Sequence, residues 1–401
     1  MIPSKTFALA FLAAALLACD ALLTEAPDPG DVLDGPVDGL TPAELAAFVA
    51  GDERFEETFA VATGLGPIFN NTSCAACHAG DGRGRPEATF SNVVVRLSPG
   101  PLDGSPTIER KAVAGAEAER EPEGVPLSRR LPPPVFGLGL IEAIPAATIL
   151  ALEDPADANG DGISGRAHWV EPAAWVPVTE AGSGPGPQLG RFTRRSRAST
   201  IFEQVVDAYH KDMGITSAYL PYENANLRAS APTSTADRVP EPEVTEDVVA
   251  QVVFYLRALA PPAPGEMTPA RQEGRTIFNA IGCALCHVPE LRTGDHPVRA
   301  LAHRTVELYS DLLLHDLGEG LSDGVGDGDA QGSEWRTAPL WGLRVMRDFL
   351  AGQAYLMHDG RARSVHEAIL LHGGEAGAVR ARYESLPLDD RSALLDFVES
   401  R

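Results

Sequence analysis

Apolar residues recur at helical spacing in several segments, and polar residues that favour helix starts precede them. Thr41 is followed by a proline and then by Glu44, a combination that satisfies the free N–H groups of a first helical turn. Thr200 and Ser364 open two further segments, each with glutamate three residues later. The pattern therefore predicts helices that begin at these three residues, together with helices over residues 246–259 and 390–398.

Alternating apolar and polar residues, the pattern of a β-strand, are scarce in this chain, and residues 90–97 form the clearest short run. Glycine and proline are frequent instead, with 39 and 33 copies among 401 residues, and they favour turns and loops. We therefore expect a mainly α-helical fold with long loops and little β structure.

Two short segments share an unusual pattern. Residues 68–78 and 277–287 both begin with Ile-Phe-Asn and both end in C-x-x-C-H. In such a loop the two thiols add to the vinyl groups of a haem, and the histidine binds the iron. A zinc site built from both loops would leave the adjacent histidines without a role. The repeat predicts two covalently bound haem c groups, attached through Cys74, Cys77, Cys283 and Cys286, with His78 and His287 as proximal iron ligands.

The repeat extends beyond these loops. Residues 130–138 and 336–343 share an arginine, a proline, an aromatic residue and a glycine in the same order, and residues 260–265 form a proline-rich linker between the halves. We therefore expect two cytochrome c-like haem domains in tandem, the first over residues 41–262 with inserted loops and the second over residues 263–401.

The N-terminal residues have the pattern of an export signal. Lys5 precedes an apolar run that is too short to span a membrane, and a small residue precedes the lone Cys19. Residues 1–18 thus resemble a bacterial lipoprotein signal, although an ordinary signal peptide with Cys19 incidental is the alternative. Residues 19–40 would form a flexible tether, and the protein would lie on the periplasmic side or at the cell surface, anchored to a membrane through Cys19.

The chain carries a net charge of −23, which argues against a nucleic-acid partner. An acidic surface could steer a basic electron-transfer partner, such as a small cytochrome or a cupredoxin, or it could serve solubility alone. The charge does not decide between these interpretations.

Residues 157–162 resemble the first half of a calcium-binding loop, because Asp157, Asn159 and Asp161 stand at alternate positions and a glycine follows at the sixth. The twelfth position is His168, where an EF-hand has glutamate. A complete EF-hand is excluded. A calcium site completed by other groups and a plain turn rich in Asp and Asn both remain open.

His372 extends an apolar stripe of the helix expected after Ser364, formed by Val365, Ala368 and Ile369, and two glycines follow it. This pattern alone fits either a core histidine held by hydrogen bonds or a distal ligand of a haem iron.

The segments around His372 carry a resemblance to a known family. The chain resembles the di-haem oxidoreductases, sometimes called thiol oxidoreductase-like, of the bacterial di-haem cytochrome c peroxidase superfamily, in residues 136–145, 212–216, 336–343, 357–362 and 367–375. In that superfamily a methionine, or a tyrosine in the methylamine dehydrogenase maturation enzyme, ligates the C-terminal haem at the position of His372. The resemblance implies that His372 is the distal ligand of the second haem, which with His287 makes a low-spin bis-histidine iron.

The first haem is expected to differ. Between the two C-x-x-C-H loops the sequence offers only His168 and His210, and no histidine follows the first loop where the peroxidases often carry a removable ligand. We therefore expect an open distal side where a small oxidant such as hydrogen peroxide can bind. Glu142 and Gln204, which resembles the distal glutamine of the peroxidases, are candidate catalytic residues; a surface role is the alternative for each.

Trp341 is a candidate electron relay between the haems, with core packing as the alternative. The sequence as a whole predicts an exported di-haem oxidoreductase of cytochrome c peroxidase type, in which electrons enter at the second haem and a small oxidant reacts at the first. A non-enzymatic di-haem electron-transfer protein is the alternative, because the fold alone does not select between them. Thiol exchange is not supported, since no free cysteine pair remains.

Overall fold

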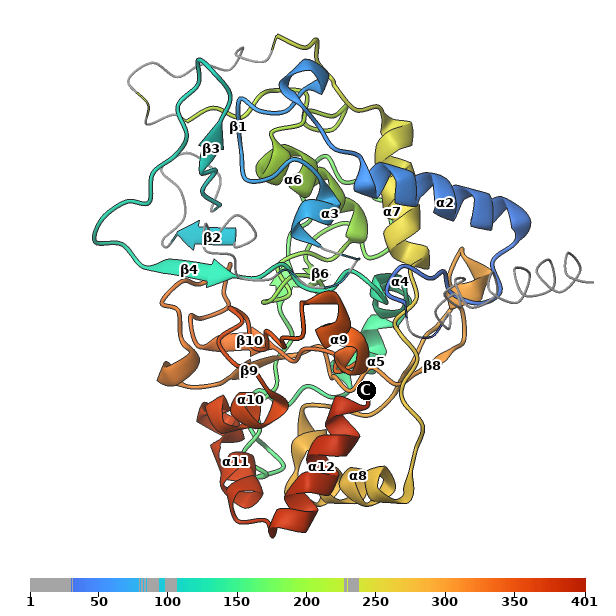
Figure 1. The fold of residues 1–401 in the computed structure, drawn as a ribbon, viewed down its shortest axis with the longest axis vertical. Helices are drawn as coiled ribbons and strands as arrows, with labels where there is room; N and C mark the ends of the chain where they lie inside the picture. Colours follow the sequence, from blue (N-terminus) through green and yellow to red (C-terminus); the bar gives the residue numbers. More distant parts are fainter. Residues whose placement is uncertain are drawn as a thin grey trace, which may run out of the picture.

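The computed structural model describes residues 30, 32–78, 80, 82, 84, 94–97, 107–226, 229 and 238–401. The fold is mainly helical with little sheet, as the sequence predicted (Figure 1). The α-helices are α2 (Pro42–Glu56), α3 (Cys74–Cys77), α4 (Leu138–Glu142), α5 (Ala146–Leu150), α6 (Ile201–Met213), α7 (Glu246–Ala258), α8 (Pro269–Ile281), α9 (Leu343–Phe349), α10 (Val365–Leu371), α11 (Gly377–Glu384) and α12 (Leu388–Glu399).

The strands of the described part form five two-stranded antiparallel sheets, and residues 94–97 of the predicted strand 90–97 are confirmed as β2. Residues 90–93 lie outside the described residues. The pairs are β1 (Ile68–Phe69) with β3 (Lys111–Ala112), β2 (Val94–Leu97) with β4 (Leu127–Arg130), β5 (Trp169–Val170) with β6 (Gln188–Leu189), β7 (Leu291–Arg292) with β8 (Thr305–Val306), and β9 (Leu314–Asp316) with β10 (Glu334–Arg336).

The predicted helix starts are confirmed, because the capping side chains make the expected hydrogen bonds. Thr41 Oγ1 accepts from the N–H of Glu44, and the Glu44 carboxylate accepts from the N–H of Thr41. At α6 and α10 the hydroxyl oxygens of Thr200 and Ser364 accept from the N–H groups of Glu203 and Glu367, which is the first of these two bonds. Each cap replaces a backbone partner that the first helical turn lacks, which explains why these starts were readable from the sequence.

Each half of the chain contains one long helix pair, α2 with α7 and α8 with α12, and the two pairs lie toward opposite ends of the molecule (Figure 1). A glycine allows close contact in both pairs. A Cβ on Gly51 would lie 2.3 Å from the Gln251 carbonyl oxygen, and one on Gly274 would lie 2.1 Å from the Ala393 carbonyl oxygen. The two halves therefore repeat the same helix contact.

The predicted tether of residues 19–40 needs correction at its C-terminal end. Leu33 and Val37 are buried in the core, and the N–H of Val37 donates to the Ala258 carbonyl at 2.8 Å. The N–H of Ala260 likewise donates to the Gly35 carbonyl at 2.8 Å. Burial of two apolar side chains and pairing of the backbone hold this segment against the protein.

The boundary between the halves at residues 262 and 263 does not divide the core. The larger hydrophobic cluster contains α2, α6 and α7 and also takes Leu291, Leu301 and Val345 from beyond the linker. The smaller cluster is built around α8, α10 and α12. The second half therefore contributes loops to the first core as well as forming a core of its own.

The predicted lipidation site Cys19 and the signal over residues 1–18 lie outside the described residues. Within the described part, no helix combines the length and the apolar character that crossing a membrane requires.

Candidate haem-binding sites

Both C-x-x-C-H loops close the same tight turn. The N–H of His78 donates to the Cys74 carbonyl at 2.9 Å, and the N–H of His287 donates to the Cys283 carbonyl at 3.0 Å. This one-turn spacing brings a thiol and an imidazole onto the same side of each loop. The local geometry therefore suits a haem that is attached through both thiols of a loop and bound at its iron by the histidine of the same loop.

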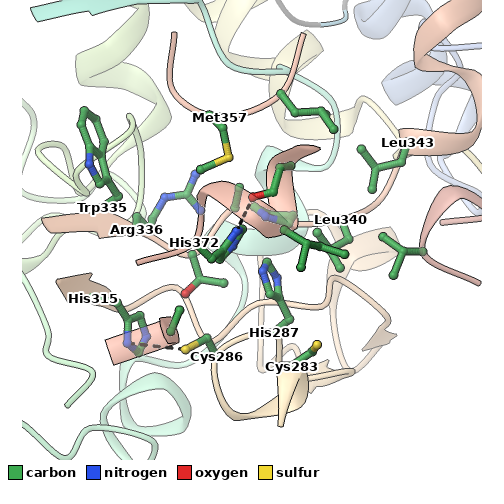
Figure 2. A pocket seen from close by; sticks show the side chains of 18 of the residues that line it. Cys283, Cys286, His287, His315, Trp335, Arg336, Leu340, Leu343, Met357 and His372 are labelled. Atoms are coloured by element: carbon green, nitrogen blue, oxygen red, sulfur yellow. Dashed lines mark hydrogen bonds between the residues drawn. The ribbon is translucent and has the colours of Figure 1, made fainter. Parts of the chain in front are cut away.

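A cavity opens beside the second loop and is lined by Cys283, Cys286, His287 and His372 (Figure 2). Its walls are otherwise mostly apolar, as a site for a flat hydrophobic cofactor requires. Side chains from both halves line it, among them Phe136, Ile141, Phe278, Leu340, Trp341, Met346 and Val365.

His287 and His372 stand opposite one another across this cavity, with ring centres 6.5 Å apart. Two imidazoles that share one metal ion should have centres about 6 Å apart, since each metal–nitrogen bond is about 2 Å and each ring centre is roughly 1 Å further. His287 Nδ1 donates to the Tyr309 carbonyl at 2.9 Å, and His372 Nδ1 donates to the Ala368 carbonyl at 2.7 Å. Each Nε2 is thereby left as the nitrogen that can bind a metal.

Both imidazoles are neutral at physiological pH. Burial lowers the pKa of His287 to about 4 and also lowers the pKa of His372. A neutral imidazole has the lone pair that a metal ligand needs. The residues present therefore fit a haem iron between His287 and His372, and the sequence prediction for His372 has the geometry it requires.

The proximal side of the first loop resembles that of the second. Burial lowers the pKa of His78 to about 4, and Asn71 Nδ2 donates to Cys77 Sγ at 3.4 Å. The Phe55 ring lies 6.2 Å from the His78 ring, close to the 6.4 Å between Phe278 and His287. The proximal sides of the two loops are thus alike. Much of the segment after His78, over residues 79–106, lies outside the described residues.

The four described cysteines form no disulfide with one another. Burial raises the pKa of Cys77 and of Cys283 to about 12. Thiol–disulfide exchange depends on the thiolate, which burial disfavours at both positions.

Glu142 lies in a buried ion pair and does not line the cavity. Arg257 Nε donates to its carboxylate at 2.5 Å, and His296 Nε2 lies 3.4 Å from it. Burial would raise the pKa of Glu142, but His296 and Arg257 outweigh that effect and lower it. Gln204 is half-buried on α6, which packs against the strand β1 that leads into the first loop.

The two histidines between the loops are engaged elsewhere. His168 is buried, with Nδ1 2.6 Å from the Arg195 carbonyl and Nε2 2.9 Å from Asp329. His210 Nε2 lies 2.8 Å from the Tyr222 carbonyl. Both ring nitrogens of His168 therefore have partners, whereas His210 Nδ1 is buried and has no hydrogen-bond partner among the described residues.

The predicted calcium residues form an exposed turn. Asp157, Asn159 and Asp161 each accept a backbone N–H through Oδ1, at 3.1, 2.8 and 2.9 Å respectively. In a calcium site these oxygens would instead point toward the ion. The hydrogen bonds are those of a turn rich in Asp and Asn, and they are compatible with either sequence interpretation, the turn alone or a calcium site.

Trp341 takes part in a reciprocal contact between the halves. A Cβ on Gly137 would lie 2.5 Å from the Trp341 ring, and a Cβ on Gly342 would lie 2.5 Å from the Phe136 ring. Each aromatic residue therefore packs on the glycine that follows its counterpart. Both glycines adopt left-handed backbone, with φ of 74° and 79°. The repeated segments at residues 136–137 and 341–342 therefore contact each other. Trp341 is buried at this contact and also lines the cavity.

Three buried side chains that carry polar groups, those of Trp335, His358 and His315, also line the cavity. The guanidinium of Arg195 lies 3.8 Å from the centre of the Trp335 ring, which is stacked at 3.8 Å on the His358 ring. His315 is held between Asp311 and Glu375, at 2.7 and 3.1 Å.

The fold and the cavity define a helical protein that can hold a flat metal-bearing cofactor between two imidazoles. A family model described as "Di-haem oxidoreductase, putative peroxidase" matches residues 24–100 and 109–401. The chain belongs to this family, and membership implies two haem groups and a redox function.

No curated protein sequence matches the chain. Two solved structures resemble it distantly. Hydrazine synthase from Kuenenia stuttgartiensis is 14% identical, with 95% of each chain covered and a TM-score of 0.38. A MauG-like protein associated with microbial copper homeostasis is 19% identical, with 53% of this chain and 69% of that chain covered and a TM-score of 0.30.

Proposed function

We propose that the protein is an exported di-haem c-type oxidoreductase of cytochrome c peroxidase type, in which electrons enter at the second haem site and a small oxidant such as hydrogen peroxide reacts at the first. The observation that carries this proposal is the difference between the sites. His287 faces a second imidazole across the cavity, whereas the ring recorded beside His78 is the phenyl ring of Phe55. A six-coordinate iron transfers electrons, and an iron with a free position can bind an oxidant.

A bound haem supplies an iron that gains and loses single electrons. The chain would hold it covalently through the two thiols of each loop, and His287, His372 and His78 would act as ligands. The mostly apolar wall around His372 disfavours water at the second site. At the first site Gln204 is the candidate for binding the oxidant. Glu142 is held as a carboxylate by Arg257, so it can accept a proton but not donate one.

The decisive experiment is ferric EPR on the purified mature protein, together with a haem count per chain. Two haems are expected, one with a low-spin bis-histidine signal and one with a high-spin signal that changes when hydrogen peroxide is added. Low-spin signals alone, under all redox conditions, would instead identify an electron-transfer protein. Gln204→Ala should slow peroxide consumption without changing the low-spin signal.

Trp341 is proposed to relay electrons between the sites, since it lies at the contact between the halves and borders the cavity. Trp341→Phe keeps an aromatic ring at this contact, although a smaller one, and should slow electron transfer between the haems after rapid reduction. An unchanged rate would assign Trp341 to packing alone.

Three further parts of the proposal concern the surroundings. Acylation of Cys19 would anchor the protein on the periplasmic side or at the cell surface, and Cys19→Ser should release it from the membrane fraction. A small cytochrome or cupredoxin would donate electrons, at a rate that falls with ionic strength. Calcium would bind at Asp157, Asn159 and Asp161, and titration of the metal-free protein would detect it.

A further inference from the structure

The guanidinium of Arg336 borders the second cavity and lacks an anionic partner there. Its backbone N–H donates to the Arg194 carbonyl at 3.0 Å, and its Nε donates to the Thr193 carbonyl at 3.1 Å. These two bonds fix the side chain at the end of β10. Its Nη1 is buried and has no hydrogen-bond partner among the described residues.

Arg336 differs from the other arginines with a buried unpaired nitrogen. Those side chains lack a partner only at Nε, whereas Arg336 lacks one at a terminal nitrogen, the part of the side chain that extends furthest. Among these in the described part are Arg191, Arg197, Arg380, Arg391 and Arg401. A charged donor left unsatisfied in the interior costs more than the roughly 1–3 kcal/mol of a neutral one. The cavity therefore lacks an acceptor that Arg336 needs.

The charge of Arg336 persists at neutral pH. Burial lowers its pKa to about 10, and Asp311 acts in the opposite direction. A planar guanidinium with a free edge binds carboxylates with particular strength, because its N–H groups match the two oxygens. The missing acceptor is therefore best supplied by a carboxylate.

The position of Arg336 matches one part of a covalently attached haem. A c-type haem joins the protein along the edge that carries its thioether bonds, and its two carboxylates extend from the opposite edge. In Figure 2, Cys283 and Cys286 lie on one side of the paired histidines, and Arg336 lies on the other. Arg336 thus borders the part of the cavity that is remote from the cysteines.

We propose that Arg336 binds a carboxylate of the second haem and so orients that edge toward the turn at residues 193 and 194. This inference rests on the proposed function. The turn belongs to the first half of the chain, and Arg194 also lines the cavity. Arg194 acts electrostatically on His78 as well. The carboxylate edge of the second haem would therefore face the segment that borders the first haem site.

The test uses Arg336→Gln, Arg336→Lys and, as a matched control, Arg380→Gln in the full haem-loaded chain. Arg380 lines the same cavity, but its Nη1 already donates to the Leu370 carbonyl at 3.3 Å. Spectroelectrochemical titration measures reduction of the second haem. Losing a buried positive charge favours the ferric state, so Arg336→Gln should lower the equilibrium constant for reduction about tenfold or more. Arg336→Lys keeps the charge and should give a smaller change in the same direction. Arg380→Gln also removes a charge that acts on His372, so it measures the effect of charge loss without loss of the proposed carboxylate contact, and Arg336→Gln should exceed it.

An unchanged potential in both Arg336 variants, with two haems bound and the low-spin signal intact, would overturn the inference and leave the proposed function standing. A larger shift in Arg380→Gln than in Arg336→Gln would also overturn it. If Arg336→Gln does not fold, the Arg336→Lys variant is the test. A lysine keeps the charge but cannot donate two parallel N–H groups to a carboxylate, so a lower equilibrium constant for reduction supports the inference and an unchanged one overturns it. A wild-type protein without two haems would refute the proposed function instead.

Discussion

The two C-x-x-C-H loops begin from the same triplet, Ile-Phe-Asn, but the triplet has two different structures. Ile68 and Phe69 form strand β1, and Asn70 Nδ2 donates to the Ile108 carbonyl at 3.0 Å. Residues 277–279 instead lie in the last turns of α8, where Asn279 is exposed. Identical local sequence therefore does not give identical structure. In the first half the triplet pairs as a strand with β3, whereas in the second half it continues helix α8.

The residues that are equivalent in space lie elsewhere in the first half. Gly51 and Phe55 occupy α2 as Gly274 and Phe278 occupy α8, each pair four residues apart. Both phenylalanines lie beside the histidine of their loop. The proximal sides are therefore conserved between the halves. The two sites differ on the side opposite the proximal histidine, because at the second site His287 faces His372.

The largest expected effect comes from removing one attachment loop at a time. Cys283→Ser with Cys286→Ser should leave one haem per chain and abolish the bis-histidine signal. Cys74→Ser with Cys77→Ser should also leave one haem but retain that signal. Haem content and ferric EPR provide the measurement. The comparison between the two sites fails if both double variants give the same spectrum.

Replacing the second imidazole should have the next largest effect. His372→Ala should convert the second haem completely from low spin to high spin, since the remaining ligand is His287 alone. His366→Ala is the matched control on the same helix, because His366 Nδ1 lies 2.6 Å from the Tyr383 hydroxyl. A low-spin spectrum that persists in His372→Ala would remove this residue from the iron.

The reciprocal contact between the halves can be tested with two glycines that share one backbone conformation. Gly342 and Gly352 both have φ of 79°, but a Cβ meets the Phe136 ring at 2.5 Å only at Gly342 and finds nothing within 4 Å at Gly352. Gly342→Ala should reduce the free energy of unfolding by about 3 kcal/mol, from backbone strain and overpacking together, and Gly352→Ala by about 1 kcal/mol. Urea unfolding measures both, and equal losses would count against the contact.

The smallest expected effect concerns pH and the buried charges that join the halves. Asp327 pairs with Arg130 and, at 3.0 Å, with Arg96, which belong to β4 and β2. Burial would raise the pKa of Asp327, but these arginines outweigh it and lower the pKa to about 2. A lowered carboxyl pKa stabilises the fold when the group is ionised. This contribution, about 2 kcal/mol, is therefore present above the ordinary pKa of about 4 and is lost as the pH falls toward 2.

Denaturant unfolding at pH 5 and at pH 2.5 measures this loss, and Asp327→Asn should remove that part of the pH dependence. Asp396→Asn is a control, because Asp396 pairs with Arg271 at 3.1 Å on the surface. An Asp327→Asn protein with the full wild-type pH dependence would show that the buried pair is not responsible.

Several features were determined by the sequence itself, because they depend on spacing over a few residues. The caps at Thr41, Thr200 and Ser364 set helix starts through side chains three residues from their partners. The C-x-x-C-H spacing sets the turn of each loop. The apolar stripe of α10 placed His372 on one face at the end of this helix for the same reason, and the family resemblance made it a candidate ligand.

Only the tertiary structure decided which groups meet across long separations. The Asp327 carboxylate and the Arg96 guanidinium that pair are 231 residues apart. Glu142 became a buried partner of Arg257, Arg336 came to border the cavity, and Leu33 entered the core. Burial, charge pairing and the opposition of His287 and His372 arise from packing between distant segments, and no local pattern of residues encodes them.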